Sequence, residues 1–223
     1  MNHPDTAIGD LADGPDGIDA VVFDYGNVIY TWEAVGAIAG RVPLARWQEF
    51  VTQADFTHWN TMFDAGVPLT QVLAALAAAH PDRPDWVEIL RTYWEHFADT
   101  KTGPVPGTAA IIEDLLEADV PLYALTNFND VLFDATRHLS PLLERFRGIV
   151  VSGREHLVKP DPAVYRLLLD RYRLHAGRTL FIDDSPVNVE AARAVGMQAH
   201  RFTGAGMLRA VLIEAGLLPA PLN

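Results

Sequence analysis

The chain has 223 residues, of which 49% are apolar and 21% charged, as is ordinary for a globular protein with a buried core. It contains no cysteine, which excludes disulfide bonds, zinc sites with thiolate ligands and a cysteine nucleophile. The formal net charge of −12 argues against binding to nucleic acid, because such binding depends on Lys and Arg neutralising phosphates.

The first 17 residues are rich in Asp, Gly and Pro, and lack the basic start and apolar stretch of a signal peptide. No apolar run reaches the roughly 18–20 residues needed to cross a bilayer. We therefore expect residues 1–17 to form a loosely ordered acidic tail, and the protein to be cytoplasmic without membrane partners. The sequence carries no indication of oligomeric state.

Alternating strands and helices are expected over most of the chain. The first strand is the apolar run 20–25 (AVVFDY), which is typical of a fully buried strand. Further strands are expected at 121–125, 148–151, 179–182 and 198–201, and helices at 109–118, 162–173 and 187–195. This alternation predicts a doubly wound, Rossmann-like parallel sheet with helices on both faces, formed by residues 18–30 and 103–223.

Residues 31–102 interrupt that alternation. Amphipathic helical patterns occur at 44–51, 69–79 and 86–97, without a clear strand, and all five tryptophans of the chain fall in this block. We expect a helical-bundle domain inserted after the first strand. Most of the tryptophans should fill its core, while one or two line a pocket against the sheet domain.

Polar clusters follow three of the expected strands. They are Asp24, the pair Thr126 and Asn127, and the pair Asp183 and Asp184. Each cluster alone has a structural explanation, such as a turn or a helix cap. Together they indicate one site, because ligands bind at the carboxyl ends of parallel strands. Three carboxylates so close together repel one another unless a cation intervenes, and oxygen ligands suit Mg²⁺.

Lys159, in the segment LVKPDPAVY, is expected near the same sheet edge. A lysine in a loop is usually only solvated. This chain is poor in cations, however, and an anionic substrate would need local positive charge to overcome the average field. Lys159 is therefore predicted to neutralise both Asp24 and a bound phosphate.

Four segments resemble the conserved motifs of the haloacid dehalogenase (HAD) superfamily, in the expected order. They read VVFDYGNVIY, LYALTNF, VSGREHLVKPDPAVY and LFIDDSPVNVEAARAVGM. The helical block resembles the α-helical cap of that superfamily. The D-x-G-N-V pattern is similar to the branch that contains sugar-1-phosphate phosphatases and epoxide-hydrolase N-terminal domains.

The resemblance implies a Mg²⁺-dependent phosphatase that acts on a small phosphorylated metabolite, such as a sugar phosphate. Asp24 would be the nucleophile and form an aspartyl-phosphate. The implied Mg²⁺ ligands are Asp24, the carbonyl of Gly26, Asp184 and, as a further ligand, Asp183. The implied phosphate-binding residues are Thr126, Asn127 and Lys159, and Asn188 would position the acidic pair.

One position departs from the pattern. Most phosphatases of the superfamily carry a second Asp two residues after the nucleophile, as general acid and base, but this chain has Gly26 there. Such a group is worth about 10²–10⁴-fold in rate. A good leaving group, or a donor from the helical block such as Glu33 or His58, would compensate.

Two other functions stay open at this point. The replacement of the second Asp by Gly26 is compatible with a non-catalytic HAD-fold binding or regulatory protein. A metal-independent 2-haloacid dehalogenase also uses an Asp nucleophile, but such enzymes resemble this chain less, because they replace the acidic pair that Asp183 and Asp184 preserve. The helical block matches no recognition code that would identify the substrate.

Overall fold

The computed structural model describes residues 17–220. Five strands form one parallel sheet in the order β5-β4-β1-β6-β7. The strands are β1 (Ala20–Phe23), β4 (Leu122–Thr126), β5 (Gly148–Val151), β6 (Thr179–Asp183) and β7 (Gln198–Arg201). The acidic tail predicted for residues 1–17 lies, apart from Gly17, outside the described residues.

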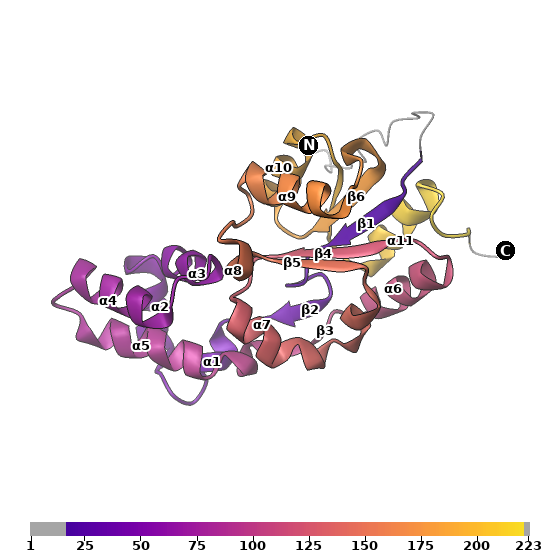
Figure 1. Ribbon diagram of the computed structural model, residues 1–223. Coiled ribbons are helices and arrows are strands. Elements are labelled where there is room, and N and C mark those ends of the chain that lie inside the picture. Colours follow the sequence, from indigo (N-terminus) through magenta and orange to yellow (C-terminus); the bar gives the residue numbers. More distant parts are fainter. Residues whose placement is uncertain (1–16, 221–223) are drawn as a thin grey trace, which may run out of the picture.

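Helices cover both faces of this sheet, because successive side chains of a strand point to opposite faces. In β1, Val21 and Phe23 belong to one buried cluster and Ala20 and Val22 to another. The first cluster includes residues of α6 (Thr108–Glu117), α7 (Asp130–Thr136) and α11 (Ala205–Glu214), and the second of α9 (Pro162–Tyr172) and α10 (Pro186–Ala194). Figure 1 shows the two layers on either side of the strands. The predicted doubly wound fold is confirmed.

Short elements complete the connections. They are α8 (Ser152–Glu155) and the 3₁₀ turns η2 (Arg137–Leu139), η3 (Pro141–Arg145) and η4 (Ala176–Arg178). No helix within residues 17–220 is long and apolar enough to span a bilayer.

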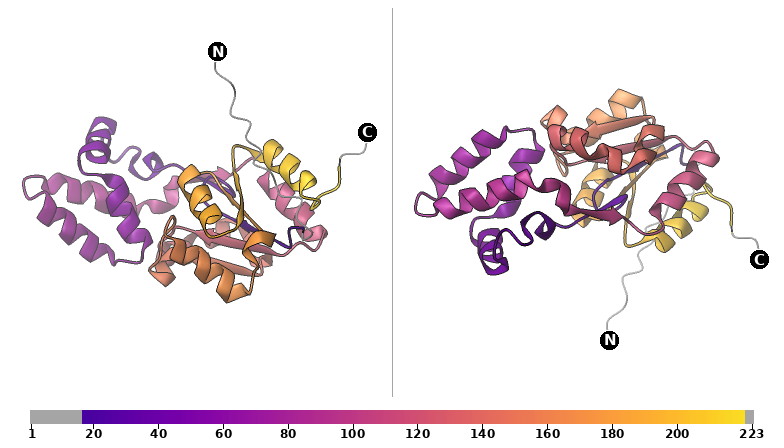
Figure 2. Two further views of the ribbon diagram at one scale, coloured as in Figure 1. Left: turned by 90° about the horizontal axis from the view of Figure 1, so that it is seen from above. Right: turned by 90° about the horizontal axis from the view of Figure 1, so that it is seen from below.

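A block of helices lies at one end of the sheet (Figures 1 and 2). It comprises α1 (Val35–Ile38), α2 (Leu44–Gln53), α3 (Phe56–Asp64), α4 (Leu69–Ala79), α5 (Pro84–Glu95) and the 3₁₀ turn η1 (Phe97–Thr100). Aromatic rings fill its interior: Trp47 stacks on Tyr93 at 5.7 Å between centroids, and Phe56 meets both rings edge-on at 5.0 Å. Four of the five tryptophans are at most 6% exposed, so most of them fill this core as expected.

Two features of the block differ from the sequence-based expectation. The short strands β2 (Tyr30–Trp32) and β3 (Lys101–Pro104) pair antiparallel where the chain enters and leaves the block, so the expectation of no strand in residues 31–102 is wrong at both ends. Helix α3 was also not expected. Its first turn begins at Asp55, whose side chain accepts a hydrogen bond from the backbone N–H of His58 at 3.3 Å.

Candidate active site

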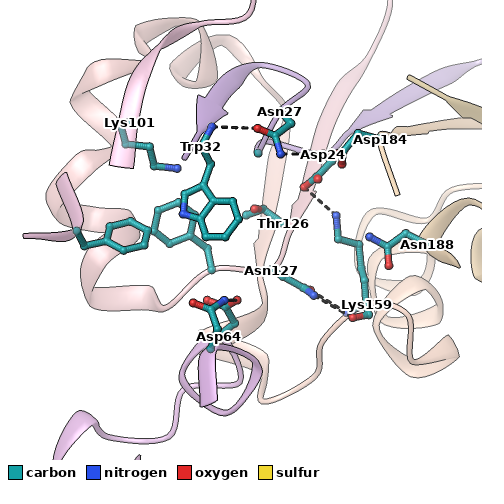
Figure 3. Close-up of a pocket in the computed structure, with 14 residues that line it drawn as sticks. Asp24, Asn27, Trp32, Asp64, Lys101, Thr126, Asn127, Lys159, Asp184 and Asn188 are labelled. Carbon is teal, nitrogen blue, oxygen red and sulfur yellow. Dashed lines mark hydrogen bonds and ion pairs between the residues drawn. The ribbon is translucent and has the colours of Figure 1, made fainter. Parts of the chain in front are cut away.

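A cavity of about 170 Å³ opens at the carboxyl ends of β1, β4 and β6. Both the sheet core and the helical block line it (Figure 3). The lining residues are Asp24, Gly26, Asn27, Trp32, Asn60, Asp64, Phe97, Lys101, Thr126, Asn127, Phe128, Lys159, Asp184 and Asn188. One water molecule occupies about 10–15 Å³ on this scale, so the cavity has room for on the order of ten waters. That is enough space for a phosphate and a small organic group.

Lys159 joins two carboxylates at the sheet edge. Its Nζ lies 2.7 Å from Asp24 Oδ1 and 2.7 Å from Asp183 Oδ2, and its side chain is 1% exposed. Burial raises the pKa of Asp24 to about 7; Lys159 opposes this rise, and the negative charges of Asp183 and Asp184 add to it. Burial alone would lower the pKa of Lys159, but the two carboxylates outweigh it and raise that pKa above its usual value.

The acidic pair is held by amide groups. Asp183, fully buried at the end of β6, accepts from Asn188 Nδ2 at 3.1 Å with each carboxylate oxygen, and from the Ser185 N–H at 2.8 Å. Asp184 Oδ2 accepts a long hydrogen bond of 3.4 Å from Asn27 Nδ2. Burial, followed by the charge of Asp183, raises the pKa of Asp184. Asn188 therefore contacts Asp183, one member of the acidic pair that the resemblance implied it would position, whereas the amide that contacts Asp184 belongs to Asn27.

The carboxylates of Asp24, Asp183 and Asp184 fit a divalent ion. One oxygen from each lies within 4.8 Å of the others. Their three negative charges face the single positive charge of Lys159, so a divalent cation offsets the remainder. Oxygen-only ligands are what Mg²⁺ prefers. Gly26, whose carbonyl the sequence analysis added to this set, lines the same cavity.

The predicted phosphate-binding residues also meet here. Thr126 ends β4, is 2% exposed and lines the cavity. The side chain of Asn127 makes two hydrogen bonds to the backbone of Lys159: its Nδ2 donates to the carbonyl at 2.9 Å, and its Oδ1 accepts from the N–H at 2.8 Å. The Asn127 side chain thus fixes the loop that carries Lys159, a positioning contact that sequence reasoning had not identified.

The helical side of the cavity carries polar groups that were not predicted from the sequence. Asp64, at the end of α3, accepts from Asn60 Nδ2 at 2.8 Å, and burial raises its pKa to about 7. Lys101, at the start of β3, places its Nζ 4.4 Å from the ring centroid of Phe128 and 4.5 Å from that of Tyr25. Burial lowers the pKa of Lys101 to about 7. No local sequence signal marks these residues, because only the packing of the block against the core turns them inward.

Glu33 and His58, the two side chains considered as proton donors, are both exposed and are absent from the cavity lining. Their positions do not support that role. Trp32 is the tryptophan that lines the cavity, as expected for one or two of the five.

One family model and several known proteins match this chain. A family model described as haloacid dehalogenase-like hydrolase matches residues 18–196. The sesquiterpene phosphatase astK of Aspergillus oryzae is 24% identical over 194 residues, which cover 82% of this chain and 89% of that protein. The phosphoglycolate phosphatase of Rhodospirillum rubrum is 28% identical over 143 residues, 60% of this chain and 58% of the relative.

Among solved structures, a HAD family enzyme from Bacteroides thetaiotaomicron in complex with magnesium and inorganic phosphate has a TM-score of 0.63. It is 15% identical, and the match covers 84% of this chain and 96% of that one. At this identity the likeness shows a shared fold.

Proposed function

This chain belongs to the haloacid dehalogenase-like hydrolases, and we propose that it is a Mg²⁺-dependent phosphatase that hydrolyses a small phosphorylated metabolite through an aspartyl-phosphate. The observation that carries the proposal is the cluster of Asp24, Asp183 and Asp184 around Lys159. The phosphatase relatives and the magnesium and phosphate bound to a structural neighbour support it.

In this proposal the carboxylates of Asp24, Asp183 and Asp184, with the carbonyl of Gly26, hold the Mg²⁺. The bound ion supplies positive charge that offsets the carboxylates and polarises the phosphoryl oxygens. Asn27 and Asn188 orient the two acidic residues at the end of β6 through their amide groups.

Asp24 is the proposed nucleophile. One of its carboxylate oxygens bonds to phosphorus while the bond from phosphorus to the leaving-group oxygen breaks, and water then releases inorganic phosphate from Asp24. Lys159 and Thr126 bind the phosphoryl oxygens, together with backbone N–H groups at Asn127. The side chain of Asn127 fixes the Lys159 loop for this contact.

The helical block, residues 31–102 in this proposal, acts as a cap domain over the core formed by residues 18–30 and 103–223. Its cavity wall offers Asn60, Asp64 and Lys101, which suit a polar substrate. The buried Asn60 Oδ1 has no hydrogen-bond partner within residues 17–220 and can accept from a ligand hydroxyl. A sugar phosphate is the substrate class that we propose on this basis.

One experiment separates this function from its two alternatives. Purified protein is assayed with p-nitrophenyl phosphate and a panel of sugar phosphates, with and without Mg²⁺, beside the Asp24→Asn variant. The proposal expects metal-dependent phosphate release that the variant loses. No turnover across the panel favours a binding protein with the same fold, and metal-independent chloride release from 2-chloropropionate favours a dehalogenase.

A further inference from the structure

No side chain enters the cavity from position 26, where most phosphatases of the superfamily carry the proton-donating Asp. A Cβ built on Gly26 would meet no atom within 4 Å, so the space beside Asp24 is open. Three carboxyl groups line the cavity, those of Asp24, Asp64 and Asp184, and no histidine does so within the described residues. Asp24 and Asp184 belong to the proposed metal cluster. Asp64 is the carboxyl group that remains.

The core fixes the end of α3 that carries Asp64. The last carbonyls of a helix lack partners within the helix. Here the carbonyls of residues 63–65 accept hydrogen bonds from three core side chains: Asn129 Nδ2 at 3.3 Å, the Ser152 hydroxyl at 2.6 Å and His156 Nδ1 at 2.9 Å. These three hydrogen bonds, called the α3 anchor below, hold Asp64 at the junction of block and core.

The carboxyl group of Asp64 is also oriented. Asn60 Nδ2 and the backbone N–H of Asn129 both donate to it. Figure 3 shows it pointing into the cavity from the side opposite Asp24. The charged groups that face it are Lys101 from β3, Asp24 and Lys159; burial has the largest effect and raises its pKa to about 7, so the protonated form is populated at neutral pH.

On the basis of the phosphatase function proposed above, we infer that Asp64 supplies the proton transfers that Gly26 leaves unserved. As Asp24 Oδ bonds to phosphorus, the Asp64 carboxyl gives its proton to the leaving-group oxygen, and the P–O bond breaks to release an alcohol. The Asp64 carboxylate then takes a proton from a water molecule as the oxygen of that water attacks phosphorus. The P–O bond to Asp24 breaks, and inorganic phosphate leaves with Asp64 protonated again.

The test compares leaving groups. An alkyl phosphate such as glycerol 2-phosphate needs a proton on its leaving oxygen, whereas p-nitrophenolate leaves without one. In Asp64→Asn we expect kcat/KM to fall about 10²–10⁴-fold for the alkyl phosphate and less than about tenfold for the aryl phosphate. Above pH 7 the rate of the wild type on the alkyl phosphate should fall as Asp64 loses its proton. The rate of the Asp64→Asn variant should not show this fall.

A second readout follows the enzyme rather than its turnover. Without Asp64 as base, hydrolysis of the aspartyl-phosphate slows, so p-nitrophenolate should appear in a burst of one equivalent per site. The phosphate adduct on the quenched protein should rise in proportion. Asp170→Asn is the matched control: it removes an exposed carboxylate on α9 that does not line the cavity, and should leave the rates of both substrates at the wild-type level, without a burst.

Each outcome decides the matter. If kcat/KM of Asp64→Asn for the alkyl phosphate stays within about threefold of wild type, the inference is wrong. It is also wrong if Lys101→Met, and not Asp64→Asn, loses activity on the alkyl phosphate but keeps it on the aryl phosphate. A wild-type protein that releases no p-nitrophenolate with Mg²⁺ overturns the phosphatase proposal itself, which distinguishes the two failures. Thermal unfolding checks that the variant is folded, and Asp64→Ala takes its place if it is not.

Discussion

The two walls of the cavity hold their charges differently. On the sheet side, Lys159 contacts two carboxylates at 2.7 Å each, and Asp183 accepts three further hydrogen bonds. On the helical side, Lys101 forms no ion pair within 4.0 Å in residues 17–220 and lies over aromatic rings instead. Buried polar groups are normally satisfied. The charges of the sheet wall are therefore paired with one another, whereas the helical wall keeps hydrogen-bonding capacity free for a ligand.

The nucleophile gives the largest expected effect. Asp24→Asn keeps the shape of the side chain but removes the attacking carboxylate, so turnover of p-nitrophenyl phosphate should fall by more than about 10⁴-fold. Thermal unfolding should show that the variant is folded. If this variant keeps metal-dependent turnover, Asp24 is not the nucleophile.

The two lysines of the cavity, Lys159 on the sheet side and Lys101 on the helical side, test the comparison directly. Lys159→Met leaves two buried carboxylates without their cation, and should lower the free energy of unfolding by about 3–5 kcal/mol at pH 8 without Mg²⁺. Lys101→Met removes a partly buried amine that is mostly uncharged at pH 8 and has no ion-pair partner among the described residues, so stability should change by less than about 1 kcal/mol or rise. Urea unfolding measures both, and equal losses would contradict the contrast between the walls.

If the proposed metal site is right, metal affinity depends on the carboxylates of the sheet wall. Asp184→Asn should weaken Mg²⁺ binding by about 10–100-fold, because the cluster loses one of its three carboxylates. Isothermal titration with Mg²⁺ measures this change. The control is Asp170→Asn, an exposed position on α9, which should bind like wild type. Full affinity in Asp184→Asn would show that the ion binds elsewhere.

The pH dependence of stability tests the carboxyl group on the helical wall. A folded-state pKa raised from 3.8 to about 7 means that folded Asp64 holds a proton that the unfolded chain has lost. Its contribution is fully present below pH 4 and is lost as pH rises to 7. Wild type should therefore lose about 1–3 kcal/mol relative to Asp64→Asn between pH 5 and 8. Parallel curves from urea unfolding would mean that the fold does not raise the pKa of Asp64.

The smallest effect is expected at Gly26. If Asp64 already supplies the proton, Gly26→Asp should change turnover of an alkyl phosphate by less than about threefold in the wild type. In the Asp64→Asn background the same change should restore much of the lost rate. A large gain in the wild type would mean that no donor was present.

The sheet wall could be predicted because strand ends are easy to locate from sequence. Apolar runs identify buried strands, and parallel strands bring the residues after them to one edge, so Asp24, Asp183 and Lys159 were expected together. The contact of Lys159 with Asp24 was predicted, but its equally short contact with Asp183 was not. The contact of the Asn127 side chain with the Lys159 backbone depends on the conformation of two loops, which no local pattern specifies.

The helical wall could not be predicted for a different reason. Which face of α3 meets the core depends on how the whole block packs, and Asp64 follows an ordinary mixed sequence, FTHWNTMF. The partners of the α3 anchor lie about 66–91 residues further along the chain. Lys101 falls in a strand of four residues, too short to show periodicity.

The central claim is that Asp24 carries the phosphoryl group, and chemical trapping tests it most directly. The protein is mixed with p-nitrophenyl phosphate and Mg²⁺, quenched and reduced with borohydride, which converts an aspartyl-phosphate to homoserine. Peptide mass spectrometry should find homoserine at position 24, and its yield should fall when Mg²⁺ is chelated. Turnover without any modification at position 24, or modification at another carboxylate, would contradict the account.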